Sequence, residues 1–452
     1  MSIHRMLAGI ALLAAALLVE RGLIAQQTQR HVVMISIDGL KPTVYTAAAP
    51  SQVPTLRRLA RQGVWAEGVT GSMPTSTYPS HTTIVTGVPP SVHGIYNNRV
   101  LDPEDTSNGA WYWYARDIKV PTLYGAVKAA GLRTAAVSWP VTVDADIDYL
   151  MPEFGGGTSH PIWLSLVRAL SKPRHLLDVY EDAGHSITWE MTDTDRVDIA
   201  IWMLRTYHPA LLLLHIYETD DVQHAYGPGS PEALTAIEAA DANVRKVTDA
   251  VAAAGLEGDT DIVVLSDHGF LGTETQLQPN FAFKRDGLLE VDARGRITRW
   301  DAYFQPAGGS GFVMLSRPDD RTLQTRVRAV LDRLQADPAN GISSILTRAD
   351  LDRFGADPRA SFGIDMKSGF YTAPDHDVLL KATRDRGGHG FTPDHVDLRS
   401  ALIMAGPDVP PAGDLGVVRL TQIGPTVASW FGVSISPRAD APLTLEPATS
   451  GR

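Results

Sequence analysis

Cysteine is absent from all 452 residues of the sequence. The chain therefore forms no disulfide, and it lacks the thiol to which a lipoprotein anchor is attached. An excess of basic residues is also absent, because the net charge is -11 at pH 7. This charge argues against a nucleic-acid backbone as a stable partner, which needs a basic face, but not against a small phosphate ester held by local cations.

A long membrane-spanning hydrophobic run is missing as well. The apolar stretch from Met6 to Val19 is too short for a comfortable span, and Glu20 and Arg21 end it. With Arg5 before this stretch and small residues near its end, residues 1–25 are predicted to form a signal peptide. We therefore expect a periplasmic or secreted protein with no membrane span after cleavage. An uncleaved anchoring helix is the alternative interpretation.

The remaining sequence has the composition of a globular protein, with 44% hydrophobic and 20% charged residues. Short apolar runs rich in β-branched residues alternate with amphipathic helical patterns. The alternation predicts an α/β fold with a mainly parallel central sheet and helices on both of its faces. The segments that carry this pattern are 31–39, 53–64, 120–140, 196–218, 233–269, 397–407 and 420–433.

One segment interrupts this pattern. Residues 273–384 are rich in loop-forming residues, yet they keep aromatic and aliphatic side chains. We expect an inserted α+β cap there, rather than a linker. The catalytic core would then consist of residues 30–272 and 385–440.

Aspartate and histidine recur where the predicted strands end. In parallel sheets these ends meet at one edge, outside which active sites gather. Aspartate oxygens and neutral imidazoles are the usual ligands of zinc and related ions where thiolates are absent. Taken singly, each residue has a simpler explanation, such as a helix cap, a helical ion pair or a turn. Together they are enough for two metal ions: Asp38, Asp220, His224, Asp267, His268 and His389.

A dense group of hydroxyl side chains lies between Pro74 and Thr83, in the stretch "PTSTYPSHTT". An alcohol attacks only when a base or a metal ion removes its proton. Two metal ions would do this and would clamp the oxygens of a phosphoryl group. The pattern therefore indicates phosphoryl transfer through a threonine or serine. The residue types alone leave four candidates open, namely Thr75, Ser76, Thr77 and Ser80.

From about Val32 to Val433 the sequence resembles the alkaline phosphatase superfamily, and within it the nucleotide pyrophosphatase/phosphodiesterase family. The motifs that carry the resemblance are "DG" at Asp38, "TYPSH" from Thr77, "HGIYNN" ending at Asn98, "DDVQHAYGP" from Asp220, "SDHG" with Asp267 and His268, and "GGHG" with His389.

The resemblance implies an alkaline-phosphatase-like core that binds two zinc ions. One zinc would be held by Asp220, His224 and His389. The other would be held by Asp38, Asp267, His268 and the Thr77 oxygen. Thr77 would be the nucleophile of a covalent phospho-threonine mechanism, Asn98 would donate to a phosphoryl oxygen, and Tyr78 would contact the substrate.

Two positions depart from the family pattern. Gln223 stands where glycine is common before the histidine of the D-x-x-x-H string, and Asp221 adds an acid beside Asp220. The four-residue spacing to His224 favours Asp220 as the ligand.

The resemblance implies hydrolysis of phosphodiester or pyrophosphate bonds in small, nucleotide-like molecules. A phosphomonoesterase of the same superfamily is an alternative, but the stretch "VTVDADIDYLMPEF" that follows Trp139-Pro140 is acidic and lacks the Lys-x-Arg pair typical of those enzymes. A catalytically inactive, metal-stabilised binding protein is a second alternative. The sequence leaves the leaving group and the oligomeric state open.

Overall fold

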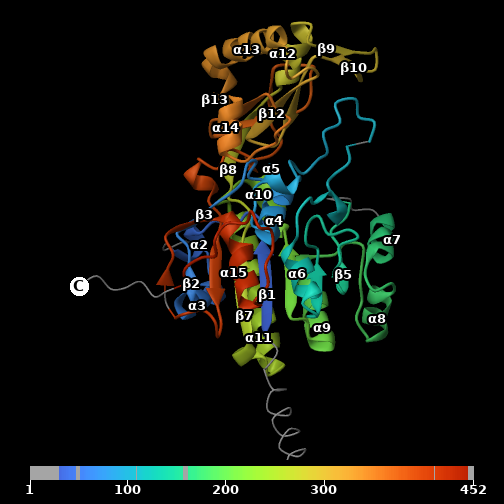
Figure 1. Ribbon diagram of the computed structural model, residues 1–452, viewed down its shortest axis with the longest axis vertical. Helices are drawn as coiled ribbons and strands as arrows, with labels where there is room; N and C mark the ends of the chain where they lie inside the picture. Colours follow the sequence, from blue (N-terminus) through green and yellow to red (C-terminus); the bar gives the residue numbers. More distant parts are fainter. Residues whose placement is uncertain (1–29, 47–50, 108, 156–160, 412, 446–452) are drawn as a thin grey trace, which may run out of the picture.

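The computed structural model describes residues 30–46, 51–107, 109–155, 161–411 and 413–445 (Figure 1). The predicted signal peptide, residues 1–25, lies outside these ranges. No helix in the described ranges combines the length and apolar character needed to cross a bilayer.

An eight-stranded sheet lies at the centre of the lower part of the molecule in Figure 1, in the order β19-β2-β18-β7-β1-β6-β4-β5. The strands from β7 to β5 pair in parallel, whereas β18 runs antiparallel to both of its neighbours. The bounds are β1 (His31–Ile37), β2 (Val64–Trp65), β4 (Thr134–Val137), β5 (Tyr149–Met151), β6 (Leu211–Ile216), β7 (Thr260–Leu265), β18 (Leu402–Ala405) and β19 (Gly413–Asp414).

Helices cover both faces of this sheet. Because side chains alternate along a strand, Val33 and Ile35 of β1 enter one core while Val32 and Met34 enter the other. The first core is closed by α3 (Pro54–Gln62), α9 (Asp193–Tyr207) and α11 (Pro231–Ala253). The second is closed by α4 (Thr77–Thr86), α6 (Leu123–Ala129) and α15 (Ile423–Trp430). The predicted fold class is confirmed.

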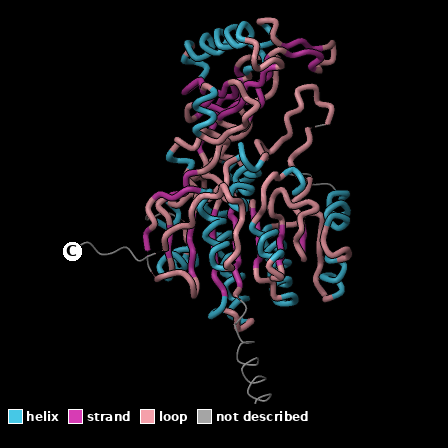
Figure 2. The backbone as a smooth tube through the Cα atoms, in the orientation of Figure 1, coloured by secondary structure: helices cyan, strands magenta, loops and turns pink. Residues whose placement is uncertain are grey.

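A second, smaller unit lies above one edge of the sheet (Figures 1 and 2). It contains a four-stranded antiparallel sheet of β11 (Ala302–Pro306), β12 (Ser310–Leu315), β14 (Phe362–Met366) and β13 (Ile342–Leu346). Its own apolar core is packed under α12 (Pro279–Arg285) and α13 (Arg321–Ala336). These elements belong to the segment expected to form the cap.

A small sheet joins the two units. Strand β8 (Leu271–Leu277) follows β7 directly and pairs with three strands that return from the cap segment. The three are β15 (Gly369–Thr372), β16 (Leu380–Ala382) and β17 (Gly387–Gly388). The chain therefore leaves and re-enters the core beside the ends of the parallel strands.

Candidate active site

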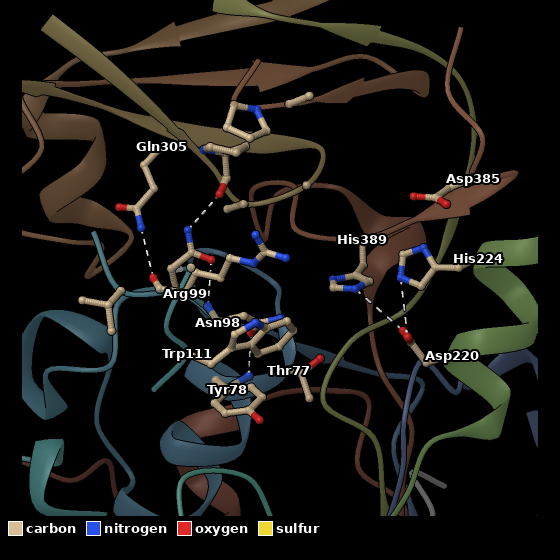
Figure 3. A pocket seen from close by; sticks show the side chains of 18 of the residues that line it. Thr77, Tyr78, Asn98, Arg99, Trp111, Asp220, His224, Gln305, Asp385 and His389 are labelled. Atoms are coloured by element: carbon tan, nitrogen blue, oxygen red, sulfur yellow. Dashed lines mark hydrogen bonds and ion pairs between the residues drawn. The ribbon is translucent and has the colours of Figure 1, made fainter. Parts of the chain in front are cut away.

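A cavity of about 1320 Å³ opens where the cap meets the carboxyl ends of the central strands. Core residues such as Asp38 and Thr77 line one side of it, and cap residues such as Tyr303, Gln305 and Tyr371 line the other. This is the edge at which parallel α/β sheets bind their ligands. Figure 3 shows the residues inside it.

The parallel strands deliver the predicted ligands to this edge. Asp38 comes directly after β1, and Asp267 and His268 follow β7, which ends at Leu265. Beyond Leu265 the chain is no longer a regular strand. The neighbouring side chains of Asp267 and His268 therefore need not point to opposite faces of the sheet, as they would within a strand. Asp220 and His224 lie one turn apart on α10 (Glu218–Tyr226), which follows β6.

One group of possible metal ligands consists of Asp220, His224 and His389, whose ligand atoms lie within 4.8 Å of one another. The Nε2 atom of His224 is 3.5 Å from Oδ2 of Asp220, and the Nε2 atom of His389 is 3.7 Å from Oδ1 of Asp220 (Figure 3). These are the three residues that the sequence assigns to one ion.

A second group consists of Asp38, Asp220 and His268, again within 4.8 Å. The Nε2 atom of His268 is 3.2 Å from Oδ1 of Asp38 and 3.2 Å from Oδ2 of Asp267. Asp220 thus belongs to both groups, and Asp267 adjoins the second one. The structure brings together all six residues that the sequence singled out.

The three histidines are oriented by the backbone. Their Nδ1 atoms lie against carbonyl oxygens: His224 on Gly387 at 2.9 Å, His389 on Thr75 at 3.1 Å and His268 on Gly269 at 3.2 Å. A proton on Nδ1 would leave the Nε2 lone pair of each histidine facing a carboxylate of Asp38 or Asp220. This is how metal-binding histidines are usually held.

The donor set fits divalent cations. Oδ1 of Asp38, Oδ1 of Asp220 and Oδ2 of Asp267 are buried and accept no hydrogen bond from the described residues. Burial and the neighbouring carboxylates of Asp267 and Asp220 raise the pKa of Asp38 well above its usual value. Burial also lowers the pKa of His268 to about 3, so this imidazole is neutral. Crowded carboxylates and neutral imidazoles are what a bound cation would stabilise.

Thr77 is the first residue of α4, and its Oγ1 is 3.4 Å from Nε2 of His268. It is half-buried and lines the cavity, whereas the other candidate hydroxyls are fully buried. Those of Thr75 and Ser76 donate to the carbonyls of Phe391 and Ala307 at 3.0 and 3.1 Å. A helix N-terminus also favours negative charge, which suits a phosphoryl group at Thr77.

Asn98 and Tyr78 lie beside the nucleophile candidate. The backbone N–H of Tyr78 donates to Oδ1 of Asn98 at 2.9 Å, so the amide oxygen is used and the amide nitrogen is left to donate elsewhere (Figure 3). Tyr78 lines the cavity, but only 1% of it is exposed. The rings of Trp111 and Trp113 cover it, with centroids 5.3 and 5.8 Å away.

The two departures from the family pattern have structural explanations. Gln223 is buried, and its Nε2 donates to the carbonyls of Gly39 and Thr219 at 3.1 and 3.2 Å, which braces the turn after Asp38. Asp221 also lines the cavity, but it belongs to neither candidate metal group.

Sequence reasoning missed two residues that support Asp38. The Oδ2 atom of Asp38 lies 3.0 Å from Nε2 of His215, and Nδ1 of His215 lies 3.0 Å from Oε2 of Glu153. The other Glu153 oxygen accepts a 2.6 Å hydrogen bond from the Tyr78 hydroxyl. A signal for His215 was present, because it is the one polar residue in the buried strand Leu211–Ile216. Glu153 gave no comparable signal.

Comparisons with known proteins agree with this geometry. Residues 32–357 match the sequence profile of the family described as type I phosphodiesterase / nucleotide pyrophosphatase. Human ectonucleotide pyrophosphatase/phosphodiesterase family member 1 is 24% identical over 249 residues, 52% of this chain and 23% of that protein. A Schizosaccharomyces pombe pyrophosphatase/phosphodiesterase is 26% identical over 294 residues, 62% of this chain and 51% of that protein. The chain thus spans from about a quarter to half of the length of these relatives.

Among solved structures, human ectonucleotide pyrophosphatase/phosphodiesterase 5 is similar in fold. The superposition has a TM-score of 0.65 at 18% sequence identity, and it covers 91% of this chain and 97% of the human protein's chain. An inactive variant of the murine protein, solved in complex with AMP, has a TM-score of 0.63 at 18% identity, covering 90% and 96%. The profile match extends over well more than half of the chain, and it includes every predicted ligand except His389. The chain therefore belongs to the type I phosphodiesterase / nucleotide pyrophosphatase family.

Proposed function

We propose that this protein hydrolyses phosphodiester or pyrophosphate bonds in small, nucleotide-like substrates, with Thr77 as the nucleophile. The observation that carries the proposal is the position of Thr77. It is the half-buried hydroxyl of its cluster, it begins a helix, and its Oγ1 lies 3.4 Å from Nε2 of His268, a member of the second candidate metal group. Family membership supports the reaction class.

The proposed cofactors are two zinc ions. Asp220, His224 and His389 would hold one, and Asp38, Asp267, His268 and the Thr77 oxygen would hold the other. Bound there, the ions would lower the pKa of the Thr77 hydroxyl and neutralise charge on the phosphoryl oxygens. Oxygen and imidazole donors without thiolates are compatible with zinc.

The residues of the chain orient the substrate. Asn98, whose Oδ1 is occupied by the Tyr78 N–H, would donate its amide N–H to a phosphoryl oxygen. Thr77 Oγ1 would form a bond to phosphorus while the bond from phosphorus to the leaving oxygen breaks. The proton lost by Thr77 is balanced by the proton that the leaving oxygen gains.

A water molecule then attacks the phosphorus of phospho-Thr77. The bond between phosphorus and Oγ1 breaks, and the threonine hydroxyl is restored. The net reaction converts a diester and one water into a monoester and an alcohol. With a pyrophosphate bond the second product is a phosphate instead of an alcohol.

The proposal extends to substrate and location. The substrate would be a small phosphate diester, and the murine structural relative in complex with AMP supports a nucleotide-like molecule. Export to the periplasm or the medium remains our expectation from residues 1–25. No stable nucleic-acid partner is proposed, given the net charge of -11.

The test compares Thr77→Ala with Thr77→Ser. Thr77→Ala should keep its zinc content but lose turnover by orders of magnitude, whereas Thr77→Ser should keep part of it because a hydroxyl remains. Substrates would be the p-nitrophenyl ester of thymidine 5′-monophosphate, bis-p-nitrophenyl phosphate and p-nitrophenyl phosphate. Unchanged turnover in Thr77→Ala would exclude Thr77 as the nucleophile. A monoester rate above both diesters would favour the phosphomonoesterase alternative.

A further inference from the structure

We propose that Thr219 and Gln223 are positioning residues, which hold helix α10 against the turn after β1 and so fix the separation of the two candidate metal groups. The inference rests on the proposed function and adds two buried residues to it, neither of which is among those that line the active-site cavity. Gln223 stands where the family commonly has glycine, which has no side chain to donate a hydrogen bond. The contact that Gln223 makes is therefore a feature of the present chain.

Helix α10 has two functional faces. Asp220 and His224 lie one turn apart on the face that looks into the cavity, toward His389 (Figure 3). Thr219 and Gln223 are also four residues apart, and each directly precedes one of these ligands. Residues at this spacing share a face of a helix. Thr219 and Gln223 therefore form a second face, rotated by about 100° from the first, and it points into the protein.

This second face contacts the turn after β1. The hydroxyl of Thr219 donates to the carbonyl of Asp38 at 2.6 Å, and Nε2 of Gln223 donates to the carbonyl of Gly39 at 3.1 Å. The same Nε2 atom donates to the carbonyl of Thr219 at 3.2 Å, which holds the Gln223 side chain along the helix. Two consecutive carbonyls of the turn are thus bonded to one face of α10.

The turn is fixed on its other side as well. The N–H of Gly39 donates to Oδ1 of Asp267 at 3.3 Å, and the N–H of Leu40 donates to Oγ of Ser266 at 2.9 Å. Gly39 has a φ of +68°, in the region that favours glycine, and a Cβ atom there would lie 2.6 Å from the ring of Phe270. The turn is therefore held between the loop after β7 and helix α10.

This arrangement joins the two groups of possible ligands. Asp220 and His224 are carried by α10, Asp38 by the turn, and Asp267 and His268 by the loop after β7. The ligand atoms of Asp38, Asp220 and His268 lie within 4.8 Å of one another. This closeness requires α10 to lie against the turn, and the bonds from Thr219 and Gln223 are contacts that place it there.

Other contacts orient ligands one at a time, such as those of the Nδ1 atoms of His224 and His389 with backbone carbonyls. Loss of the bonds from Thr219 and Gln223 should therefore displace α10 relative to the turn while every ligand is retained. A displacement of about 1 Å caused by a mutation away from the reacting atoms can lower turnover by about 100-fold. Substrate binding and metal affinity should change less, because the groups that make them are still present.

The experiment removes the two donors one at a time from the full chain. Gln223→Met and Thr219→Val keep approximately the size of the side chain but cannot donate. In each zinc-loaded variant we expect kcat for the p-nitrophenyl ester of thymidine 5′-monophosphate to fall by about 10- to 100-fold, while KM changes by less than about 3-fold. Zinc affinity, measured by chelator competition, should stay close to that of the wild-type protein.

A second measurement needs no substrate. The protein is loaded with Mn²⁺ alone, and the magnetic interaction between the bound ions is followed by electron paramagnetic resonance, because this interaction depends on their separation. The spectra of Gln223→Met and Thr219→Val should differ from that of the wild-type protein. Thr219→Ser keeps the hydroxyl, so it should keep the wild-type spectrum and most of the turnover.

Thr426→Val is the matched control. The hydroxyl of Thr426 is buried in α15, donates to the carbonyl of Gln422 at 2.7 Å and does not line the cavity. Its loss removes a buried hydrogen bond of the same kind, and it should change neither kcat nor the Mn²⁺ spectrum. Gln223→Gly, with the residue common in the family, replaces Gln223→Met if that variant does not fold.

A Mn²⁺ spectrum that is unchanged in both donor variants would overturn the inference, and so would full turnover in both. A loss of turnover explained by weaker zinc binding would overturn it too, because Thr219 and Gln223 would then act on affinity rather than on separation. If the wild-type protein binds no metal and hydrolyses none of the test esters, the proposed function itself fails. Normal hydrolysis in the wild-type protein and in both variants would remove only the present inference.

Discussion

Asp38 and His215 are joined through Oδ2 and Nε2 at 3.0 Å, in the buried interior where β1 and β6 pair in parallel. The contact fixes one oxygen of Asp38, and the other oxygen faces His268 at 3.2 Å. Glu153 holds the far side of the His215 ring at 3.0 Å. A carboxylate that is proposed to bind metal is thus anchored by two residues that would not touch the ion.

The first prediction concerns this anchor. In His215→Gln, Asp38 loses its imidazole partner, and we expect zinc affinity to fall by about 10- to 100-fold, as for other residues that orient metal ligands. Chelator competition measured on the folded protein gives the affinity. His185→Gln is the matched control, because His185 is exposed and stacks on Tyr180 at 4.3 Å. Equal zinc affinity in the two variants would show that His215 is only a packing residue.

The second prediction concerns removal of the metal. Asp38, Asp220 and Asp267 each keep a buried oxygen without a hydrogen bond in the described residues. A cation that binds only the folded state stabilises it, by about 4 kcal/mol at 1,000 times its dissociation constant. Chelation should therefore abolish turnover and also lower the melting temperature, and added zinc should restore both. Hydrolysis that persists in chelator would contradict a metal-dependent reaction.

The third prediction separates two roles of Tyr78. Its hydroxyl donates to Glu153 at 2.6 Å, and its ring is 1% exposed. Tyr78→Phe should lower the free energy of unfolding by about 1–3 kcal/mol, because the half-buried Glu153 carboxylate loses a hydrogen-bond donor. KM should stay nearly unchanged, since the ring is covered by Trp111. Urea denaturation and steady-state kinetics measure the two effects. A large rise in KM with unchanged stability would instead support the prediction that Tyr78 contacts the substrate.

The fourth prediction concerns pH and lies outside the proposed metal site. The hydrogen bond from His395 to Asp365, 2.8 Å long, raises the pKa of His395 above its usual value. A raised histidine pKa stabilises the fold fully below the unfolded-state pKa of about 6.5, and this contribution is lost as pH rises through the folded pKa. The wild-type protein should therefore lose its advantage over His395→Gln as the pH rises above about 6.5 and through the raised pKa of His395 in the folded state. Denaturation midpoints at several pH values test this, and a constant difference would contradict it.

Much of the fold was readable in advance because it follows from local patterns. The apolar residues of the strand His31–Ile37 and the helical spacing of apolar residues in Pro54–Gln62 are each recognisable from a few adjacent residues. The direction of β18 was not readable, because an apolar four-residue strand looks the same whether it pairs parallel or antiparallel. The carboxylate of Glu153 gave no pattern either.

By itself, the sequence determined the alternation of strands and helices, the polar residues at the strand ends, and the order Thr77-Tyr78-Pro79-x-His81 that identifies one hydroxyl by resemblance. Only the tertiary structure decided which atoms meet. It placed Asp220 between two groups of ligands, buried Tyr78 under Trp111, and attached Asp38 to His215 across 177 residues. The physical reason is that composition and hydrophobic periodicity determine local structure over only a few neighbouring residues. Contacts between strand ends depend instead on pairing order and on the cap that closes over them.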